Sequence, residues 1–392
     1  MFYLLYAILC LRSSVGGKRM TEIYLIRHTQ AEGNRYRMMQ GFWDGEVTEK
    51  GKRQIEELAK RFEHVPLDAV YSSDLSRAVM TADAAARWKN LPIQTRTALR
   101  ELNIGPWEQK FFGNLSYEEP ELTNRFIFDA ENWHLEGAET FAQVRARALA
   151  ELKKIAEENE GKTVAVASHG ATIRCIMSGI TGIPLTDVKR LPIFKNTAVT
   201  KLLWDGERFQ VEYMNDASHL PPEAQSSWNT SADLRDEILD PSDDRAYYEA
   251  CYADAWTSAH GSLHGYNPDT YLSAAVRHHA KQPGSVMRIC HHEEPVGLVD
   301  LDPERGAADG AGWISLLYLK ESYRNQGYGI QVLARPIFFY KDLGRHSLRL
   351  QVAEENAIAC AFYRREGFRV LREEKSQTGN GKLLLMERPL RA

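Results

Sequence analysis

The sequence predicts two domains of different class, an N-terminal α/β domain with a mainly parallel sheet and a C-terminal α+β domain. In residues 21–222, short apolar runs such as Ile23–Ile26 and Val164–Ala167 alternate with helical stretches, which is typical of a parallel sheet covered on both faces. After residue 236, two helices precede a series of strands, an order typical of helices packed on an antiparallel sheet. At 392 residues, the chain is long enough to form two separate cores.

The elements of the first domain follow from two periodicities. Short continuous apolar runs predict buried strands, and apolar residues three and four positions apart predict amphipathic helices. The pair Asp205-Gly206 between two apolar stretches predicts a closing hairpin. In chain order we expect a strand at Ile23–Ile26, a helix at Gly51–Phe62, a strand at Ala69–Ser72, helices at Asp74–Trp88 and Ala138–Asn159, a strand at Val164–Ala167, a helix at Ala171–Ser178, and hairpin strands at Thr197–Trp204 and Phe209–Asn215.

The second domain shows a different order of the same signals. Polar turns at Glu293-Glu294 and Gly306–Gly312 separate its first three strands. We expect helices at Asp244–Ser258 and Asp269–Lys281, strands at Val286–Cys290, Val296–Asp300 and Trp313–Leu319, a helix at Gly329–Leu343, a strand at Ser347–Val352, a helix at Ala357–Arg365, and late strands at Phe368–Arg372 and Lys382–Met386.

We place the first domain at residues 20–222 and the second at 236–392, joined by a polar linker over 223–235 that lacks apolar periodicity. The apolar stretch Met1–Leu11 has no basic residues before it and is too short to span a bilayer. We expect translation to start at Met20, with residues 1–19 an over-extended gene assignment. A cleaved signal, a membrane anchor and an ordered extra element are the alternatives.

Charge and cysteine content narrow the class of partner and compartment. The net charge is −4 with both signs interleaved, so we expect no nucleic acid and no membrane as partners. The five cysteines are scattered, and neither a CxxC pair nor a zinc-ligand spacing occurs. This cysteine usage favours a reducing, cytoplasmic setting.

Polar residues at the ends of the predicted strands suggest a phosphate pocket. Arg27 and His28 end the first strand, Asn34 lies in the next loop, Arg77 opens a helix and His169 ends another strand. Ligands of open α/β sheets bind outside the carboxyl ends of the strands, which is where these residues map. Arginines can neutralise a phosphomonoester, and a neutral imidazole can attack its phosphorus. Neighbouring arginines would also hold the pKa of His28 low.

Departure of the alcohol from phosphorus also requires a proton donor. Glu101 follows a short apolar segment and supplies a carboxyl group for this role.

Residues 21–222 resemble the histidine phosphatase superfamily, which includes cofactor-dependent phosphoglycerate mutases. The resemblance implies a three-layer αβα fold, His28 as phosphorylated nucleophile and Glu101 as proton donor. It implies phosphate ligands at Arg27, Asn34, Arg77, His169 and Gly170, and neither a metal nor a cofactor. The matching pieces are Leu25–Thr29 with Glu32-Gly33-Asn34, Gln40-Gly41 with Asp44, Thr48 and Gly51, Ser72–Ala78 with Thr81-Ala82, Leu99-Arg100-Glu101 with Gly105 and Trp107-Glu108, and Ser168-His169-Gly170.

Within this superfamily the chain is more similar to the small phosphatases than to the mutases. The mutases carry a longer domain and a Trp-Asn-rich stretch after the first motif, which this chain lacks. The segment Leu99-Arg100-Glu101 looks like that of small phosphatases such as the α-ribazole phosphatases. Gln109 stands where those proteins usually have Gly after Trp-Glu. We therefore favour hydrolysis of a phosphomonoester, with a mutase as the alternative.

The second domain carries a glycine-containing loop between a strand and a helix. Glycines at the start of a helix let backbone amides approach phosphate groups closely. The loop lacks both a dinucleotide fingerprint and a Walker lysine. Its sequence is Arg324-Asn325-Gln326-Gly327-Tyr328-Gly329-Ile330.

Residues 236–390 resemble the GNAT acetyltransferases, through this loop and a downstream pattern of Asn356, Ala359, Phe362, Tyr363, Gly367 and Phe368. The resemblance implies acetyl-CoA as cosubstrate, with its pyrophosphate on the loop amides and its pantetheine arm along the strand at Leu317–Leu319. Tyr363 would protonate the departing thiolate and Asn356 would contact the cofactor arm. The acceptor would be an amine. No general base is evident, since Glu354 and Glu355 are weak candidates.

Three functional hypotheses follow. The first is a bifunctional enzyme that hydrolyses a small phosphomonoester and acetylates an amine. The second is a phosphatase, or a phosphoglycerate mutase-like enzyme, whose second domain binds acetyl-CoA without transferring the acetyl group. The third is a binding module for phosphorylated ligands with both sites idle, against which the presence of Glu101 and Tyr363 argues.

Overall fold

The computed structural model describes residues 14–15, 18–225, 233–375 and 381–390. The chain divides into two compact units, Met1–Asn229 and Thr230–Ala392, and each is described by itself. Most of the predicted N-terminal extension and the middle of the predicted linker lie outside the described residues. Two short strands, β1 (Ser14–Val15) and β2 (Lys18–Arg19), precede the first unit's main sheet.

The main sheet of the first unit has six strands in the order β5-β4-β6-β3-β7-β8. The pairs β5–β4, β4–β6 and β6–β3 are parallel, whereas β7 and β8 form the antiparallel closing hairpin. The predicted, mainly parallel sheet is therefore confirmed. Its strands are β3 (Thr21–Arg27), β4 (Ala69–Ser72), β5 (Ile93–Thr95), β6 (Thr163–Ser168), β7 (Val199–Trp204) and β8 (Phe209–Asp216).

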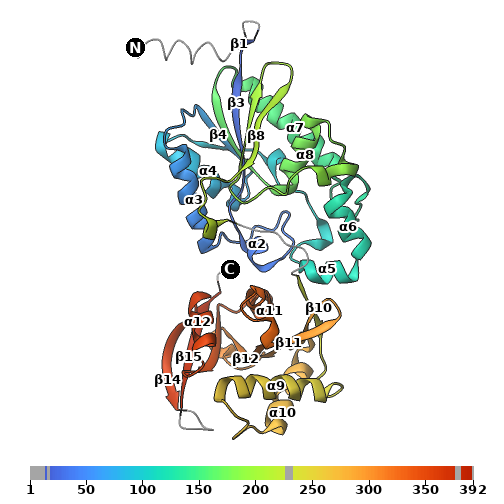
Figure 1. The fold of residues 1–392 in the computed structure, drawn as a ribbon, viewed down its shortest axis with the longest axis vertical. Coiled ribbons are helices and arrows are strands. Elements are labelled where there is room, and N and C mark those ends of the chain that lie inside the picture. The colour runs from blue at the N-terminus through green and yellow to red at the C-terminus, as the bar shows by residue number, and fades with distance from the viewer. Residues whose placement is uncertain (1–13, 16–17, 226–232, 376–380, 391–392) are drawn as a thin grey trace. The chain divides into compact units, whose positions relative to one another are not determined.

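Helices cover both faces of this sheet, because side chains alternate between the faces along each strand (Figure 1). Ile23 and Leu25 of β3 enter a core with α7 (Phe141–Glu158) and α8 (Gly170–Thr181). Ile26 enters a second core with α3 (Glu49–Phe62) and α4 (Ser76–Ala86). The first unit is thus a three-layer αβα domain. The remaining helices are α2 (Glu32–Tyr36), α5 (Phe112–Glu118) and α6 (Pro120–Phe128).

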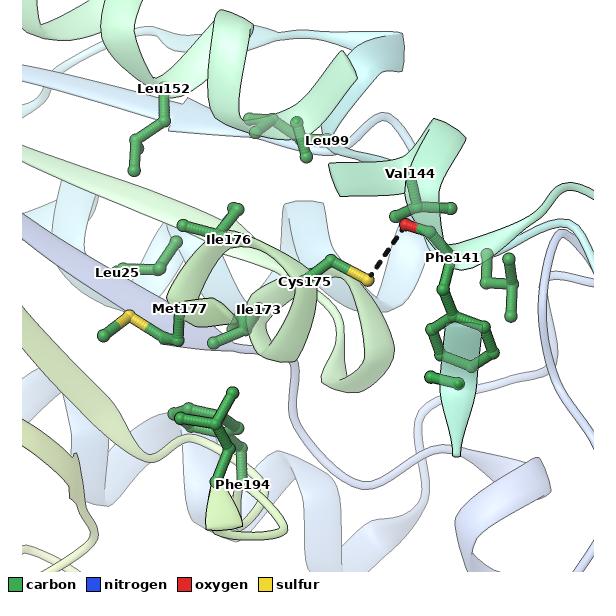
Figure 2. Packing of buried hydrophobic residues seen from close by; sticks show 14 of the residues in the cluster. Leu25, Leu99, Phe141, Val144, Leu152, Ile173, Cys175, Ile176, Met177 and Phe194 are labelled. Carbon is green, nitrogen blue, oxygen red and sulfur yellow. Dashed lines mark hydrogen bonds between the residues drawn. The ribbon is translucent and has the colours of Figure 1, made fainter. Parts of the chain in front are cut away.

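Figure 2 shows the first of these cores around α8. Cys175 lies among apolar side chains, and its thiol donates a hydrogen bond to the carbonyl of Phe141, with 3.6 Å between the heavy atoms. Burial raises the pKa of this thiol to about 12, so it behaves as a packing residue rather than a nucleophile.

Several elements differ from the sequence prediction. The strand β5 and the helices α5 and α6 were absent from it, because a three-residue edge strand and helices of seven and nine residues give little periodic signal. The predicted helix Asp74–Trp88 begins only at Ser76, since Leu75 is still extended and the carboxylate of Asp74 binds Arg100.

The second unit is a seven-stranded sheet in the order β14-β15-β13-β12-β11-β10-β9, in which only β12 and β13 pair in parallel. This α+β order confirms the prediction. Its strands are β9 (Leu234–Ile238), β10 (Val286–His291), β11 (Glu294–Asp302), β12 (Ala311–Leu319), β13 (Ser347–Ala353), β14 (Arg369–Lys375) and β15 (Lys382–Pro389). Its helices are α9 (Arg245–His260), α10 (Pro268–Lys281), α11 (Tyr328–Asp342) and α12 (Ala357–Arg365).

The strand β9 begins at Leu234, inside the stretch that the sequence assigns to the linker. Its polar sequence hides it, because only Leu234 and Arg235 are buried. Buried Arg335 of α11 secures β9 by donating to the carbonyl of Leu234 and to the carboxylate of Asp236.

No helix of the described residues is both long enough and apolar enough to cross a membrane.

A buried polar network links α9 and α10 to β11. The carboxylate of Asp300 accepts hydrogen bonds from Tyr248, at 2.8 Å between oxygens, and from Nδ1 of His278, at 2.7 Å. Nε2 of His278 lies 3.4 Å from Asp302. Burial disfavours the imidazolium, but the two carboxylates outweigh it and raise the pKa of His278 to about 9. The second unit therefore folds with a charged histidine at its centre.

We expect the second unit to lose stability as the pH rises from 6.5 towards 10. The folded state holds the proton of His278 more tightly than the unfolded chain, so the difference contributes up to about 3 kcal/mol below pH 6.5 and vanishes above the folded pKa. Urea unfolding of the full chain, read by pulse labelling of buried Cys290 and Cys360, reports this unit. His278→Gln should remove the pH dependence, and an equal dependence in that variant contradicts the assignment.

Candidate active sites

The two predicted histidines meet at one edge of the first sheet. Arg27, the last residue of β3, pairs with Ser168, the last residue of β6, so His28 and His169 leave neighbouring strands together. The amide of His28 donates to the carbonyl of Ser168 at 2.8 Å. Their ring centroids lie 5.1 Å apart, and both rings are buried.

His28 is held as a neutral imidazole with a defined free nitrogen. Its Nδ1 lies 2.6 Å from the carbonyl oxygen of Thr29, which can only accept, so Nδ1 carries the proton and Nε2 carries the lone pair. Burial, reinforced by the positive charges of Arg77 and Arg27, holds the pKa of His28 well below its ordinary value. Nε2 is therefore available as a nucleophile at neutral pH.

Two buried guanidinium groups stand beside these histidines. Arg27 donates through one terminal nitrogen to the carbonyl of Phe194, and Arg77 donates to the carbonyls of Gly41 at 2.7 Å and Trp43 at 2.9 Å. The Nε of each has no hydrogen-bond partner among the described residues. Burial lowers the pKa of Arg27 to about 10, which leaves it charged at neutral pH.

Among the described residues, neither ring nitrogen of His169 has a hydrogen-bond partner, although the side chain is fully buried. Burial and the positive charge of Arg77 hold its pKa well below the ordinary value. An unpaired buried polar group costs about 1–3 kcal/mol, so a fold that retains three such groups in one place requires compensation. An anion that accepts from His169, Arg27 and Arg77 would supply it.

Asn34 is oriented by a residue that the sequence analysis missed. Its Oδ1 accepts from the amide of Ala31 at 3.1 Å and from Nδ2 of Asn196 at 3.2 Å, which turns its own amide nitrogen away from both. The same Nδ2 of Asn196 donates to the carbonyl of His28 at 3.0 Å. Thr197, next to it, has a φ of 57°, which is rare for a β-branched residue. This strained backbone at Thr197 marks the neighbouring Asn196 as a candidate functional residue. No sequence motif predicts it.

Glu101 is bound at the N-terminus of α8. Its Oε1 accepts from the amides of Leu102 and Thr172, both at 3.0 Å, and its Oε2 accepts from the amide of Ala171 at 3.2 Å. Thr172 also places its hydroxyl 3.1 Å from Oε1. Oε1 is therefore saturated, and Oε2 keeps a free lone pair that can carry a proton.

Arg147 of α7, also missed from the sequence, fixes the backbone that carries Glu101. It donates to the carbonyls of Ala98, Arg100 and Glu101 at 2.8–2.9 Å. Its Nε and one terminal nitrogen also form a bidentate ion pair with the carboxylate of Glu139 at 2.8 Å. The sequence does not predict this role for an arginine in a helix, because every residue has a backbone carbonyl and residue type therefore does not show which carbonyls it binds.

Glu108 of the Trp-Glu motif organises the loop that faces Arg77. Its carboxylate accepts from the amides of Gly41, Phe42 and Trp43. A Cβ on Gly41 would stand 2.4 Å from the carbonyl of Leu102, so only glycine fits there. Gln109 adopts a φ of 62°, which explains why a glycine would be suited to this position.

The second unit opens a gap between two parallel strands. β12 pairs with β13 only from Ala311 to Ile314, so residues 315–319 have no partner on that side. A bulge in the pairing with β11 lies at the same point, between Ile314 and Leu316. The free edge of β12, which includes Leu317 and Leu319, can accept an extended amide-containing arm.

The predicted cradle lies directly after this free edge. Asn325 and Gly327 adopt φ values of 61° and 87°, and Gly327 caps α11. Apart from hydrogen bonds within helices and strands, the backbone amides of residues 325–330 donate to no backbone carbonyl of the described residues. Arg324 donates through Nε to the carbonyl of Leu319, and Gln326 donates to that of Ser322, so these two side chains brace the loop rather than extend from it. The arrangement fits a pyrophosphate at a helix N-terminus.

Tyr363 and Asn356 come from the helix that follows β13. Among the described residues, no hydrogen bond is made by the Tyr363 hydroxyl, and burial raises its pKa above the ordinary value, which keeps the phenol protonated. Asn356 caps α12, since its Oδ1 accepts from the amide of Ala359 at 3.1 Å. α12 is adjacent to the cradle, because Phe362 would lie 3.1 Å from a Cβ on Gly329.

No group of three or more His, Cys, Asp or Glu side chains in the described part of the chain could hold a metal ion.

Comparisons with known proteins match both units. The model of the histidine phosphatase superfamily (branch 1) covers residues 23–217, and that of the acetyltransferase (GNAT) family covers 246–368. A Shigella boydii protein named probable phosphoglycerate mutase GpmB is 29% identical over 206 residues, 51% of this chain and 95% of that protein. A protein of the same name from Escherichia coli K12 matches equally.

Solved structures similar to the first unit include YhfR from Bacillus stearothermophilus, with 33% identity and a TM-score of 0.49, covering 51% of this chain and 98% of that one. A phosphoserine phosphatase from Entamoeba histolytica has 26% identity and a TM-score of 0.46, covering 51% and 100%.

Removing the side chain of Asn196 should weaken anion binding without unfolding the domain. Asn196→Ala removes one of the two hydrogen bonds that orient the Asn34 amide and leaves only the one from Ala31, so we expect the affinity for orthovanadate to fall about tenfold, near the value of one hydrogen bond to a charged group. Asn132→Ala, on an exposed helical turn, is the control. Equal vanadate affinity in both variants would show that Asn196 has no part in positioning Asn34.

Proposed function

Because the chain joins a histidine phosphatase superfamily domain to a GNAT family domain, we propose a bifunctional enzyme that hydrolyses a small phosphomonoester and transfers an acetyl group from acetyl-CoA to an amine. The observation that carries the first activity is the neutral His28 beside Arg27, Arg77 and His169, whose unpaired nitrogens converge at one sheet edge. No metal or cofactor is part of the proposed hydrolysis.

The first step is attack by Nε2 of His28 on the bound phosphoryl group. Arg27, Arg77, His169 and the Asn34 amide would donate to its oxygens and offset its negative charge. As the N–P bond forms and the P–O bond breaks, positive charge develops on the imidazole. The hydrogen bond from Nδ1 to the Thr29 carbonyl stabilises that charge and keeps the ring in place.

Glu101 would supply the proton that the departing alcohol needs. In the free site its carboxylate is stabilised by three backbone amides at the α8 N-terminus. Oε2, which keeps a free lone pair, would carry the proton that passes to the leaving oxygen. After the alcohol leaves, the resulting carboxylate can accept a proton from water, which then attacks phosphorus and releases phosphate from His28.

The mutase alternative rests on one observation, the 29% identity to proteins named probable phosphoglycerate mutase GpmB. A mutase returns the phosphoryl group from histidine to an alcohol, whereas a phosphatase passes it to water. The two reactions share every residue described above, so only the fate of the phosphoryl group distinguishes them.

We expect metal-independent phosphate release that disappears in His28→Ala. In the presence of EDTA, a panel of phosphomonoesters at neutral pH should yield phosphate with the wild type, and the variant should lose at least a thousandfold in rate, since it lacks the proposed nucleophile. The readouts are released phosphate and acid-labile phosphoprotein.

Asn132→Ala, on an exposed helical turn, controls for folding. Phosphate release by well-folded His28→Ala would refute the nucleophile assignment. Phosphoryl exchange between 2- and 3-phosphoglycerate without net phosphate release would establish the mutase instead.

For acetyl transfer, the residues of the second unit have separate roles. Acetyl-CoA, when bound, supplies the acetyl group as a thioester. The amides of residues 325–330 would hold its pyrophosphate, with Arg324 and Gln326 bracing the loop, and Leu317 and Leu319 would pair with its extended arm. Asn356 retains its amide NH₂ for the same arm, because only its oxygen is used as a cap. The protonated phenol of Tyr363 would protonate the thiolate.

Tyr363→Phe should slow acetylation of an amine panel by about 10²–10³-fold while the affinity for CoA changes less than about threefold, because it removes only the proton donor. Product formation and equilibrium CoA binding measure the two effects. Tyr340→Phe is the matched control, because it removes a tyrosine hydroxyl that lies in the core, 2.8 Å from the carbonyls of Asp302 and Trp313. A large loss of CoA affinity would assign Tyr363 a structural role.

A wild-type protein that binds CoA but acetylates no amine would support the alternative in which the second unit only binds acetyl-CoA.

A further inference from the structure

We propose that the acceptor of the second unit is a cationic amine and that Asp254 of α9 binds its ammonium group. This inference rests on the acetyl transfer proposed above and names the chemical class of its second substrate. It arises from a carboxylate placed at the free edge of β12, where no sequence motif marks a residue.

Asp254 is coupled directly to the unpaired part of β12. The hydroxyl of Tyr318 donates to Oδ2 of Asp254 at 2.6 Å. Tyr318 stands between Leu317 and Leu319, in the segment that has no partner on the β13 side. The ring of Tyr318 packs in the same apolar core as Tyr248 of α9 and Leu298 of β11. Its hydroxyl therefore reaches α9.

The cradle also reaches Asp254. Arg324 places a terminal nitrogen 3.8 Å from the same Oδ2 and another 3.4 Å from the hydroxyl of Ser258, one turn further along α9. Through Nε it holds the carbonyl of Leu319. Asp254 therefore sits where α9, the end of β12 and the start of the cradle meet, and two neighbours fix its orientation.

One oxygen of this carboxylate remains available. Tyr318 and Arg324 both contact Oδ2, whereas Oδ1 has no hydrogen bond or ion pair within the described residues. The side chain is 51% exposed, so Oδ1 can meet a ligand from solvent. Glu354 and Glu355, the acids considered from the sequence, follow β13 instead, and the amide of Glu354 pairs with Lys382. Neither contacts the free edge of β12.

A fixed carboxylate with one free oxygen selects a charged donor. An ammonium supplies both the opposite charge and several N–H groups, and charge-assisted hydrogen bonds are about twice as strong as neutral ones. A neutral hydroxyl acceptor would donate only one uncharged hydrogen bond to Oδ1. The site therefore discriminates in favour of amines that are protonated in solution.

The transfer balances with Asp254 unchanged. The ammonium loses one proton to solvent before its nitrogen attacks the thioester carbonyl. An N–C bond then forms and the C–S bond breaks, and the electron pair of that bond leaves with sulfur. The thiolate takes a proton from Tyr363, and the second proton lost by the nitrogen restores the phenol. The products are the amide, the CoA thiol and one proton in solution.

The test uses the full chain and two substitutions that remove the same charge. Asp254→Asn retains an oxygen that can accept from Tyr318 but loses the negative charge. Asp243→Asn also removes a negative charge, at an exposed position whose side chain forms no hydrogen bond or ion pair within the described residues. Calorimetric titration of 1,4-diaminobutane in the presence of CoA should show at least a tenfold weaker affinity in Asp254→Asn and no change in Asp243→Asn. Equal affinities in the two variants, or no diamine binding by the wild type, overturn the proposal.

Steady-state acetylation separates this inference from the proposed function. If both hold, Asp254→Asn raises the KM for the diamine at least tenfold and changes kcat less than about threefold. Acetylation with an unchanged KM refutes the role of Asp254 while acetyl transfer stands. Diamine binding that depends on Asp254 but is followed by no acetylation supports the cation site and refutes the transfer.

Discussion

The parallel pairing of β3 with β6 sets the positions of His28 and His169, on which the rest of the first site depends. Its register places Arg27 opposite Ser168, so the residues after each strand, His28 and His169, enter the same space. A shift of one residue would turn one histidine to the opposite face, because side chains alternate along a strand. The apolar alternation of Ile23, Leu25 and Ile26 between two cores fixes that register. Core packing and active-site geometry are thus specified by the same few residues.

Both sites also exploit backbone groups that regular structure leaves without partners. In the first unit, the N-terminal amides of α8 bind Glu101. In the second, β12 parts from β13 after Ile314 and leaves a free edge that leads into the capping turn of α11. Helix ends and separated strands provide donors and acceptors without any special side chain. This explains why two chemically different sites can be built on unrelated folds with so few polar residues.

The sequence predicts most of the fold and singles out the candidate site residues, because both leave a pattern in residue type. His28 and His169 follow the ends of two strands, as predicted. Tyr363 lies in the predicted helix after β13. The supporting residues escape such reasoning. Asn196 and Arg147 act through carbonyls brought near by the fold, and Asp254 reaches Tyr318 across 64 positions in sequence. Contacts of this kind depend on three-dimensional proximity, which residue order does not reveal. The strand β9 escapes for another reason, since its edge position allows a polar sequence.

The N-terminus of α8 carries two parts of the first site at once. His169 caps this helix, and the amides of Ala171 and Thr172 hold Glu101. Any displacement of the helix therefore moves His169 and Glu101 together. Such linkage restricts how the domain can diverge in evolution, because a change in α8 that suits a new leaving group also disturbs the phosphate contacts. New substrates are then more easily acquired through α5 and α6, whose residues make none of the contacts described for the phosphate group. Shared support of this kind ties two parts of the proposed site to a single helix.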